Sequence, residues 1–449
     1  MSRPPKDRPF KDRGGRAVPS RRLSRLAGLG GMAANVAGGM MLSSAKQLAS
    51  GKRPKLSDLV MTPKNARKVT RQLSNMRGAA MKIGQMISMD SGDFLPKEFA
   101  DILARLRADA QHMPGPQLDG VLRAQWGEGW QAQFKEFDYH PIAAASIGQV
   151  HYAELPDGET LAIKVQYPGV RDSIDSDINN VASLLRMTGL VPSTLDIKPV
   201  IEEGRVQLHQ EADYLREAEY LSRFGELLAG DNNFEVPDYY PDLSTDKILT
   251  MSYLEGTPIE DMADAPQETR DRIIYLLIDL LLSELFVFKT MQTDPNFANY
   301  QYNEETDKLV LLDFGASRDI EDTLSAAYQN LMQTVVSGRT EETYAAAMAM
   351  GLIAEGIPDK YQAIVLELLG MVREPLSRDA PFDFGDNNIA LDMRETAMEL
   401  AGKRELWHVP PSETIFIQRK FGGIYMLATR LKARVNIYEI MRKYAGDRT

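Results

Sequence analysis

The spacing of apolar positions changes several times along the first half of the chain, and each spacing predicts a different element. Residues 56–108 carry Leu, Met and Ile three and four positions apart, which predicts helix. Between 134 and 167, apolar and polar residues alternate on either side of Asp157-Gly158, which predicts a β-hairpin. Helical spacing returns at 197–228. From residue 56 to residue 228, the pattern therefore predicts helix, then sheet, then helix again.

The second half is predicted to be mostly helical. Strands are expected at 246–254 and in the short segment 308–313. The apolar run Ile273–Phe288 contains the charged residues Asp279 and Glu284, so it is expected to be a buried core helix and not a membrane span. This order predicts an α+β, two-lobed fold with a small β-containing lobe before a larger helical lobe.

The N-terminal segment has a basic, aperiodic start. Residues 1–22 are rich in Arg, Pro and Gly, which is typical of a disordered arm. Within the first 25 residues, nine Lys and Arg side chains against two Asp give a charge of +7. Such an arm is either a solvated tail or an attachment to anionic membrane lipids. In the second case, each basic side chain near the surface contributes ~1 kcal/mol of binding free energy.

An apolar stretch follows from Leu26 to Leu42. Gly30, Ala34 and Gly38 recur every four positions, so they share one helix face that permits close helix approach. The stretch has 17 residues, which is at or below the ~20 of a dependable span. A signal peptide is less favoured because the helical pattern continues. We expect a membrane-touching or self-associating helix, and hence a possible homodimer.

Composition narrows the chemistry. The chain has 449 residues, 43% of them hydrophobic and 26% charged, which is ordinary globular composition. No cysteine is present, which excludes disulfides and thiolate metal sites, and only five histidines occur, so any metal is expected to have oxygen ligands. The net charge of -11 argues against binding nucleic acid.

Several segments match the needs of phosphoryl transfer, which are a phosphate-orienting lysine, metal-binding oxygens and a residue for the acceptor. Lys164 ends an alternating strand in LAIKVQ, and an inward-pointing lysine requires an acidic partner. If QEADYLREAEY is one helix, Asp213 and Glu217 share a face that Glu211 does not. The alternatives are a surface lysine and a solvated charged helix.

Two further motifs lie downstream. Asp294 and Asn299 have the Asp-x-x-x-x-Asn spacing of a kinase catalytic loop, and Asp313-Phe314-Gly315 begins fourteen residues after Asn299. The aspartate of the first motif orients the acceptor, and the asparagine amide and second aspartate bind metal. Either motif alone is weak, but their order and spacing together are specific.

An alanine-rich segment occupies the position of a kinase phosphate loop. Methyl groups in place of glycines restrict the backbone and crowd the phosphates, so nucleotide preference is expected to differ from that of a typical kinase. The alternative is a plain alanine-rich turn. The candidate nucleotide-binding residues here are Ala143, Ala144, Ala145, Ser146 and Gly148.

Together these motifs resemble the UbiB/ADCK/AarF family of atypical kinases, from about residue 20 to about residue 440. The KxGQ motif of the family corresponds to Lys82, Gly84 and Gln85 in MKIGQ. AAASIGQVH, the ExD motif at Glu211 and Asp213, MQTDPNFAN and LLDFGASR also agree. The wording MQTDPN and the C-terminal segment RKFGG…LKAR look closer to the mitochondrial-type ADCK branch than to bacterial UbiB proteins, whose loop typically reads HADPHPGN.

The resemblance implies roles for single residues. Lys164 orients the α- and β-phosphates of ATP or ADP and pairs with Glu217. Asp294 is the catalytic aspartate, and Asn299 and Asp313 bind Mg²⁺. Regulatory roles fall to the KxGQ extension, in which Lys82 and Gln85 lie over the site and meet Glu211 and Asp213.

Departures from ordinary protein kinases define the expected function. Gln292 and Thr293 replace the His and Arg of HRD, and no APE motif follows Gly315. The resemblance implies a membrane-associated kinase or ATPase that binds Mg²⁺ and an adenine nucleotide and supports ubiquinone biosynthesis, acting on lipid precursors or their modifying enzymes. A pseudokinase scaffold and a conventional protein-serine kinase are the alternatives.

The expected location is the cytoplasmic face of a bacterial inner membrane, or a mitochondrion if the source is eukaryotic. The expected domains are a disordered arm (1–25), a membrane-associating helix (26–50), the KxGQ extension (51–130), an N-lobe (131–255) and a C-lobe (256–449).

Overall fold

The computed structural model describes most of the chain beyond the N-terminal segment. The described residues are 73, 76–91, 112–188, 198–294, 296–353, 358–371, 373–386, 389, 392, 396 and 412–444. The predicted basic arm and membrane-associating helix therefore lie outside the described residues. The chain divides into two compact units, of residues 3–219 with 238–253 and of residues 220–237 with 254–449. They are called the first and the second unit below.

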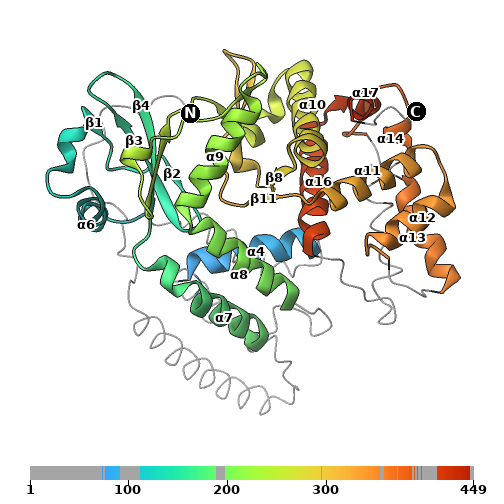
Figure 1. Ribbon diagram of the computed structural model, residues 1–449, viewed down its shortest axis with the longest axis horizontal. Helices are drawn as coiled ribbons and strands as arrows, with labels where there is room; N and C mark the ends of the chain where they lie inside the picture. The colour runs from blue at the N-terminus through green and yellow to red at the C-terminus, as the bar shows by residue number, and fades with distance from the viewer. Residues whose placement is uncertain are drawn as a thin grey trace, which may run out of the picture. The chain divides into compact units, whose positions relative to one another are not determined.

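The first unit is built on an antiparallel sheet (Figure 1). Its hairpin of β3 (Gly148–Glu154) and β4 (Thr160–Gln166) confirms the hairpin predicted around Asp157-Gly158. Gly158 has φ 98°, a left-handed conformation that favours glycine. The sheet order is β1 (Glu136–Phe137), β3, β4 and β6 (Ile248–Ser252), with β2 (Ala143–Ala144) also pairing with β3.

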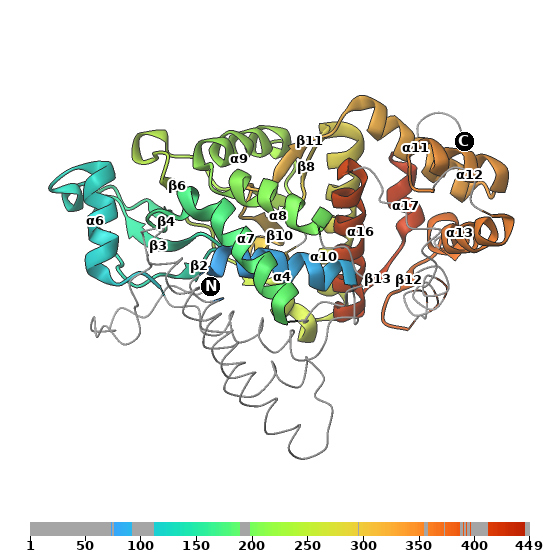
Figure 2. The same ribbon diagram turned by 90° about the horizontal axis from the view of Figure 1, so that it is seen from below.

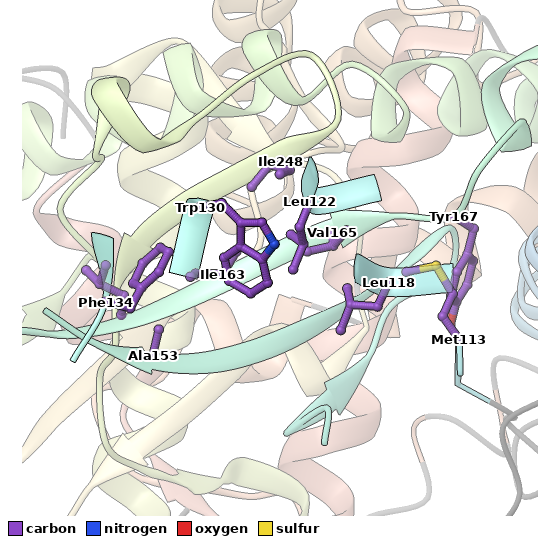
Figure 3. Close-up of a cluster of buried hydrophobic side chains, with 11 residues drawn as sticks. Met113, Leu118, Leu122, Trp130, Phe134, Ala153, Ile163, Val165, Tyr167 and Ile248 are labelled. Atoms are coloured by element: carbon purple, nitrogen blue, oxygen red, sulfur yellow. The ribbon is translucent and has the colours of Figure 1, made fainter. Parts of the chain in front are cut away.

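The two faces of β4 have different surroundings because side chains alternate along a strand. Leu161, Ile163 and Val165 are fully buried on one face. Figure 3 shows Trp130 and Leu122 beside that face; they come from η2 (Trp130–Gln133) and α6 (Gly115–Trp126). Lys164 and Gln166 lie on the opposite face. The strand therefore separates the apolar core of this unit from a polar side.

A group of helices completes the first unit. α4 (Arg77–Ser91), within the KxGQ extension, packs against α7 (Val170–Thr188) and α8 (Lys198–Glu211) (Figure 2). Ile83 and Met86 of α4 are buried, and a Cβ on Gly204 of α8 would lie 2.4 Å from Ile83 Cδ1. Gly204 thus permits close packing of α4 and α8.

The prediction of one helix over 197–228 was wrong. α8 ends at Glu211, and α9 (Tyr214–Leu228) starts after a break. Asp213 causes the break, since its Oδ1 accepts from Arg216 N at 3.2 Å and so caps α9. Asp213 therefore sits at the N-cap of α9, one turn before Glu217, and Glu211 belongs to a different helix.

The second unit is mainly helical. α10 (Gln267–Ser283) continues into a π-helical turn, η5 (Glu284–Phe288), and eight of the α10 side chains are buried, which confirms the predicted core helix. Its other helices are α11 (Asp322–Val336), α12 (Thr340–Ala349), α13 (Asp359–Met371), α14 (Arg373–Ser377), α16 (Ser412–Leu431) and α17 (Ile437–Arg442). Among the described residues, no helix is long and apolar enough to cross a membrane.

Small sheets sit among these helices. One has the order β5 (Phe234–Glu235), β10 (Lys308–Leu311), β9 (Tyr300–Asn303) and β7 (Thr257–Pro258), and another pairs β8 (Thr290–Gln292) with β11 (Ser317–Asp319). A further pair is β12 (Phe382–Asp383) with β13 (Arg434–Val435). β6 and β10 confirm the strands predicted at 246–254 and 308–313. A sheet-based unit and a mainly helical unit together confirm the α+β class.

Candidate active site

Lys164 makes a buried ion pair with Glu217. Its Nζ lies 2.7 Å and 2.9 Å from the two carboxylate oxygens, and the two residues are only 6% and 1% exposed. The same Nζ lies 5.3 Å from the centre of the Tyr214 ring. Gln166 Nε2, on the same face of β4, donates to Ala212 O at 3.1 Å beside the start of α9. The alternative of a surface lysine is therefore excluded.

The alanine-rich segment forms a tight reversal between two strands. Ala143 and Ala144 are exposed and pair with β3, and Ala145 N donates to Gly148 O at 2.9 Å. A Cβ on Gly148 would lie 2.5 Å from Val165 O and 2.7 Å from the Tyr214 hydroxyl. Glycine is therefore required at position 148.

The KxGQ helix lies directly against this reversal. Lys82 is 3% exposed, and its Nζ lies 2.6 Å from Glu211 Oε1. The other oxygen of Glu211 accepts from Ser146 Oγ at 2.5 Å. A Cβ on Gly78 of α4 would lie 2.9 Å from Ser146 O. One carboxylate thus connects the extension to the alanine-rich segment.

The remaining candidate regulatory residues are placed as follows. Gly84 is buried in α4. Gln85 is also in α4, but its side chain is outside the described residues. Asp213 caps α9, and its Oδ2 lies 3.9 Å from Arg171.

In the second unit, two loops that carry the remaining candidates are joined at both ends. Thr293 Oγ1 donates to Ala316 O at 2.6 Å, next to the pairing of β8 with β11. At the other end, Leu312 N donates to Asn299 O at 3.0 Å, next to the pairing of β9 with β10. Loops 293–299 and 312–316 therefore lie side by side. This brings together Asp294, Asn299 and Asp313.

Local hydrogen bonds orient the carboxylates in these loops. Asp294 Oδ1 accepts from Asn296 N at 3.3 Å, and Asp313 Oδ1 accepts from Gly315 N at 3.0 Å. Each aspartate thus uses one oxygen to shape its own turn.

Asn299 supports the assignment of a metal site. Its side chain is 8% exposed, and its Nδ2 is buried without a hydrogen-bond partner. The two terminal atoms of an amide exchange places by a half-turn, so this side chain can present its oxygen to a cation. With the Asp313 carboxylate it gives the hard oxygen donors that Mg²⁺ prefers.

The number of protein ligands also fits magnesium, because Asn299 and Asp313 supply one amide and one carboxylate. Mg²⁺ usually binds through one or two carboxylates and completes its shell with water and substrate phosphates. The residues present therefore fit a nucleotide-dependent magnesium site better than a metal cage made by protein alone.

Sequence reasoning missed two contacts around these groups. The hydrogen bond from Ser146 to Glu211 joins residues 65 positions apart, and no local sequence pattern predicts it. Phe224 packs against Phe314 of the Asp-Phe-Gly motif. Its spacing of seven from Glu217, two helical turns, was an available signal, because it places both on one face of α9.

These features define a class of protein. A central strand carries a lysine paired with a helical glutamate, and a helical unit carries the Asp-x-x-x-x-Asn and Asp-Phe-Gly loops. This is a protein-kinase-like fold with an added helical extension. The solved structure of a complex titled Rv3197-erythromycin, from Mycobacterium tuberculosis, has a TM-score of 0.57 and 22% identity, covering 85% of this chain and 95% of that one. This likeness supports the fold alone.

The sequence comparisons identify the family. Residues 105–347 match the model of the ABC1 atypical kinase-like domain. Atypical kinase COQ8, mitochondrial, of Saccharomyces cerevisiae is 38% identical over 431 residues, covering 95% of this chain and 85% of that protein. Atypical kinase COQ8B, mitochondrial, of Danio rerio is 36% identical, covering 93% and 68%. The chain belongs to this family of ABC1, or UbiB/COQ8-type, atypical kinases.

Proposed function

We propose that this protein binds Mg²⁺ with an adenine nucleotide and catalyses ATP hydrolysis or phosphoryl transfer in support of ubiquinone biosynthesis. The observation that carries the proposal is the pair of joined loops that holds Asp294, Asn299 and Asp313 together. A scaffold that only binds nucleotide has no chemical need for an acceptor-orienting aspartate beside two metal-binding groups.

Each residue has a role in this proposal. Lys164, held by Glu217, orients the nucleotide phosphates, and Asn299 and Asp313 hold Mg²⁺. When bound, the ion neutralises charge on the phosphate oxygens. Asp294 orients the hydroxyl of the acceptor or a water molecule and accepts its proton. Ser146 and Gly148 shape the backbone next to the phosphates.

Ordinary protein phosphorylation is less well supported. The Lys82–Glu211–Ser146 connection holds α4 against the alanine-rich segment, and resemblance to the family implies that this extension occupies the space of a protein substrate. No APE motif follows the metal loop. We therefore infer that the acceptor is a small lipid-soluble quinone precursor or water.

The membrane role rests on the sequence of the N-terminal segment. The +7 charge of residues 1–25 favours anionic lipids, and the apolar stretch that follows favours a bilayer surface or a second copy of the chain. We propose peripheral attachment at the membrane where quinone precursors reside. Relatives named as mitochondrial support a mitochondrion as that location, and a bacterial inner membrane is the alternative.

ATP turnover by the purified protein tests the proposal. Hydrolysis is measured with Mg²⁺, with and without anionic liposomes and a phenolic mimic of a quinone precursor. Asp294→Asn is expected to abolish turnover while nucleotide binding survives, and Asp386→Asn, an exposed aspartate of the same unit, serves as the matched control. Lipid-stimulated turnover that vanishes only in the first variant supports the proposal. Nucleotide binding without turnover under every condition supports a scaffold instead.

A further inference from the structure

A second buried ion pair lies in the second unit and is made by none of the candidate residues described above. Glu284, the first residue of η5, is 1% exposed, and Lys420 of α16 is 2% exposed. The two side chains form a salt bridge. Figure 2 shows α10, which η5 continues, side by side with α16. Because burying two charges is rarely more stabilising than apolar packing, this pair calls for a role beyond holding helices together.

The second carboxylate oxygen of Glu284 reaches the candidate catalytic loop. Glu284 Oε1 accepts from the backbone N of Gln292 at 3.2 Å. Gln292 ends β8, two residues before Asp294, and among the described strands β8 pairs with β11 alone. The carboxylate therefore supplies an acceptor for a strand N–H that would otherwise be buried without one.

The Gln292 side chain extends this connection to the far end of the loop. Its Oε1 accepts from the Tyr300 hydroxyl at 3.0 Å, and Tyr300 directly follows Asn299. The hydroxyl is the donor in this bond, because an amide oxygen can only accept. Both ends of loop 293–299 are thus tied to the same buried polar chain.

We propose that Glu284 and Lys420 are positioning residues for the candidate catalytic loop, with Glu284 fixing the backbone that carries Asp294 and Lys420 holding Glu284 in place. This inference rests on the proposed function, since it concerns the same loop. Burial raises the pKa of Glu284 and lowers that of Lys420, and each is opposed by the charge of its partner. Removing Lys420 alone therefore leaves Glu284 buried without compensation.

Two double variants separate positioning from stability. Lys420→Met/Glu284→Gln removes both charges but keeps a side-chain acceptor for Gln292 N. Lys420→Met/Glu284→Leu removes the charges and the acceptor. We expect both to melt close to the wild-type temperature, whereas Lys420→Met alone melts lower. The leucine variant is expected to lose about tenfold in kcat, because it lacks one hydrogen bond, with an unchanged KM for ATP. The glutamine variant is expected to keep the wild-type kcat.

A pair of conservative variants gives a second test that does not require replacing the buried ion pair. Tyr300→Phe removes the donor to Gln292 and is expected to lower kcat severalfold without changing KM. Tyr302→Phe, on the same strand, removes a hydroxyl that bonds to Asp307 instead and is expected to leave kcat unchanged. If the leucine variant does not fold, the comparison of Tyr300→Phe with Tyr302→Phe still tests the positioning role.

Amide hydrogen exchange across residues 290–300 tests the positioning role independently of turnover. Exchange is expected to rise in the leucine variant and in Tyr300→Phe, and to stay at the wild-type level in the glutamine variant and in Tyr302→Phe. If the wild-type protein hydrolyses no ATP, the proposed function fails but this measurement still decides the positioning role. Equal exchange and equal kcat within each pair of variants would overturn the inference.

Discussion

The ring of Phe224 packs against the ring of Phe314, with centroids 5.0 Å apart and the side chains 0% and 2% exposed. Phe314 belongs to the candidate metal loop, and Phe224 lies on α9, seven residues after Glu217. Next to it, Arg223 Nη1 lies 2.6 Å from Asp319 Oδ1, beyond the same loop. The helix that supplies the partner of Lys164 therefore also supports the loop that carries Asp313.

Replacing Phe224 with leucine tests this support. The substitution nearly conserves volume, so it is expected to lower the free energy of unfolding by only about 1 kcal/mol. Turnover is expected to fall by more than the stability change explains, because the metal loop loses its ring contact. ATP hydrolysis and chemical unfolding measure the two effects. Leu227→Ala on the same helix is the control, since Leu227 is 36% exposed, and equal turnover in both variants would contradict the idea.

Local patterns predicted the elements better than the contacts between them. The turn at Asp157-Gly158 and the apolar run of α10 were evident because each depends on residues close in sequence. The break before α9 was missed because the cap, Asp213, sits inside a continuous helical pattern. The pair of Glu284 and Lys420 could not be inferred, since its partners are 136 positions apart and lysines and glutamates are normally exposed.

The candidate site was predicted to a similar extent. Spacing placed Asp294, Asn299 and Asp313 on two loops, and strand pairing at both ends of those loops explains why they meet. Helical spacing alone left the acidic partner of Lys164 open, and the resemblance to the family assigned Glu217 to it. The structure pairs Glu217 with Lys164 and Glu211 with Lys82.

Loss of the Lys164–Glu217 pair is expected to destabilise the first unit strongly. Lys164→Met removes the buried cation that faces the Glu217 carboxylate, which costs roughly 3–5 kcal/mol of unfolding free energy. In contrast, Arg123→Gln removes a helix surface pair with Asp119 from a side chain that is 48% exposed. That change is expected to cost much less, because solvent screens an exposed pair. Denaturant unfolding of both variants checks the contrast, and similar losses would refute it.

Two hydrogen bonds fix the tautomer of the buried His151 ring. Its Nδ1 lies 2.9 Å from Asp138 O, which can only accept, so Nδ1 carries the proton. Its Nε2 then accepts from Gln149 Nε2 at 2.8 Å. Gln149 in turn accepts from Met113 N at 2.7 Å. The neutral imidazole thus fixes the segment that leads into α6.

Burial lowers the pKa of His151 from 6.5 to about 4, with smaller contributions from the charges of His112 and His140. Between these pH values the unfolded chain binds a proton that the folded chain does not. The stability contribution of His151 is therefore complete above pH 6.5 and is lost as the pH falls towards 4, on the order of 3 kcal/mol in total. Unfolding free energies across this range measure the slope. His151→Gln, which does not titrate, should show a smaller slope, and an identical slope would rule the effect out.

Two glycines of the first unit should respond to alanine in opposite ways. At Gly148 the new methyl would lie 2.5 Å from Val165 O, so β3 or β4 must shift, at a cost of roughly 1–3 kcal/mol. At Gly120, exposed within α6, no atom lies within 4 Å of the new methyl, and alanine is expected to add about 0.5–1 kcal/mol of stability. Because Gly148 also ends the alanine-rich reversal, its variant should weaken nucleotide binding, and the Gly120 variant should not. Chemical unfolding together with ATP titration distinguishes the two sites. Unchanged ATP binding by Gly148→Ala would show that the alanine-rich reversal does not contribute to nucleotide binding.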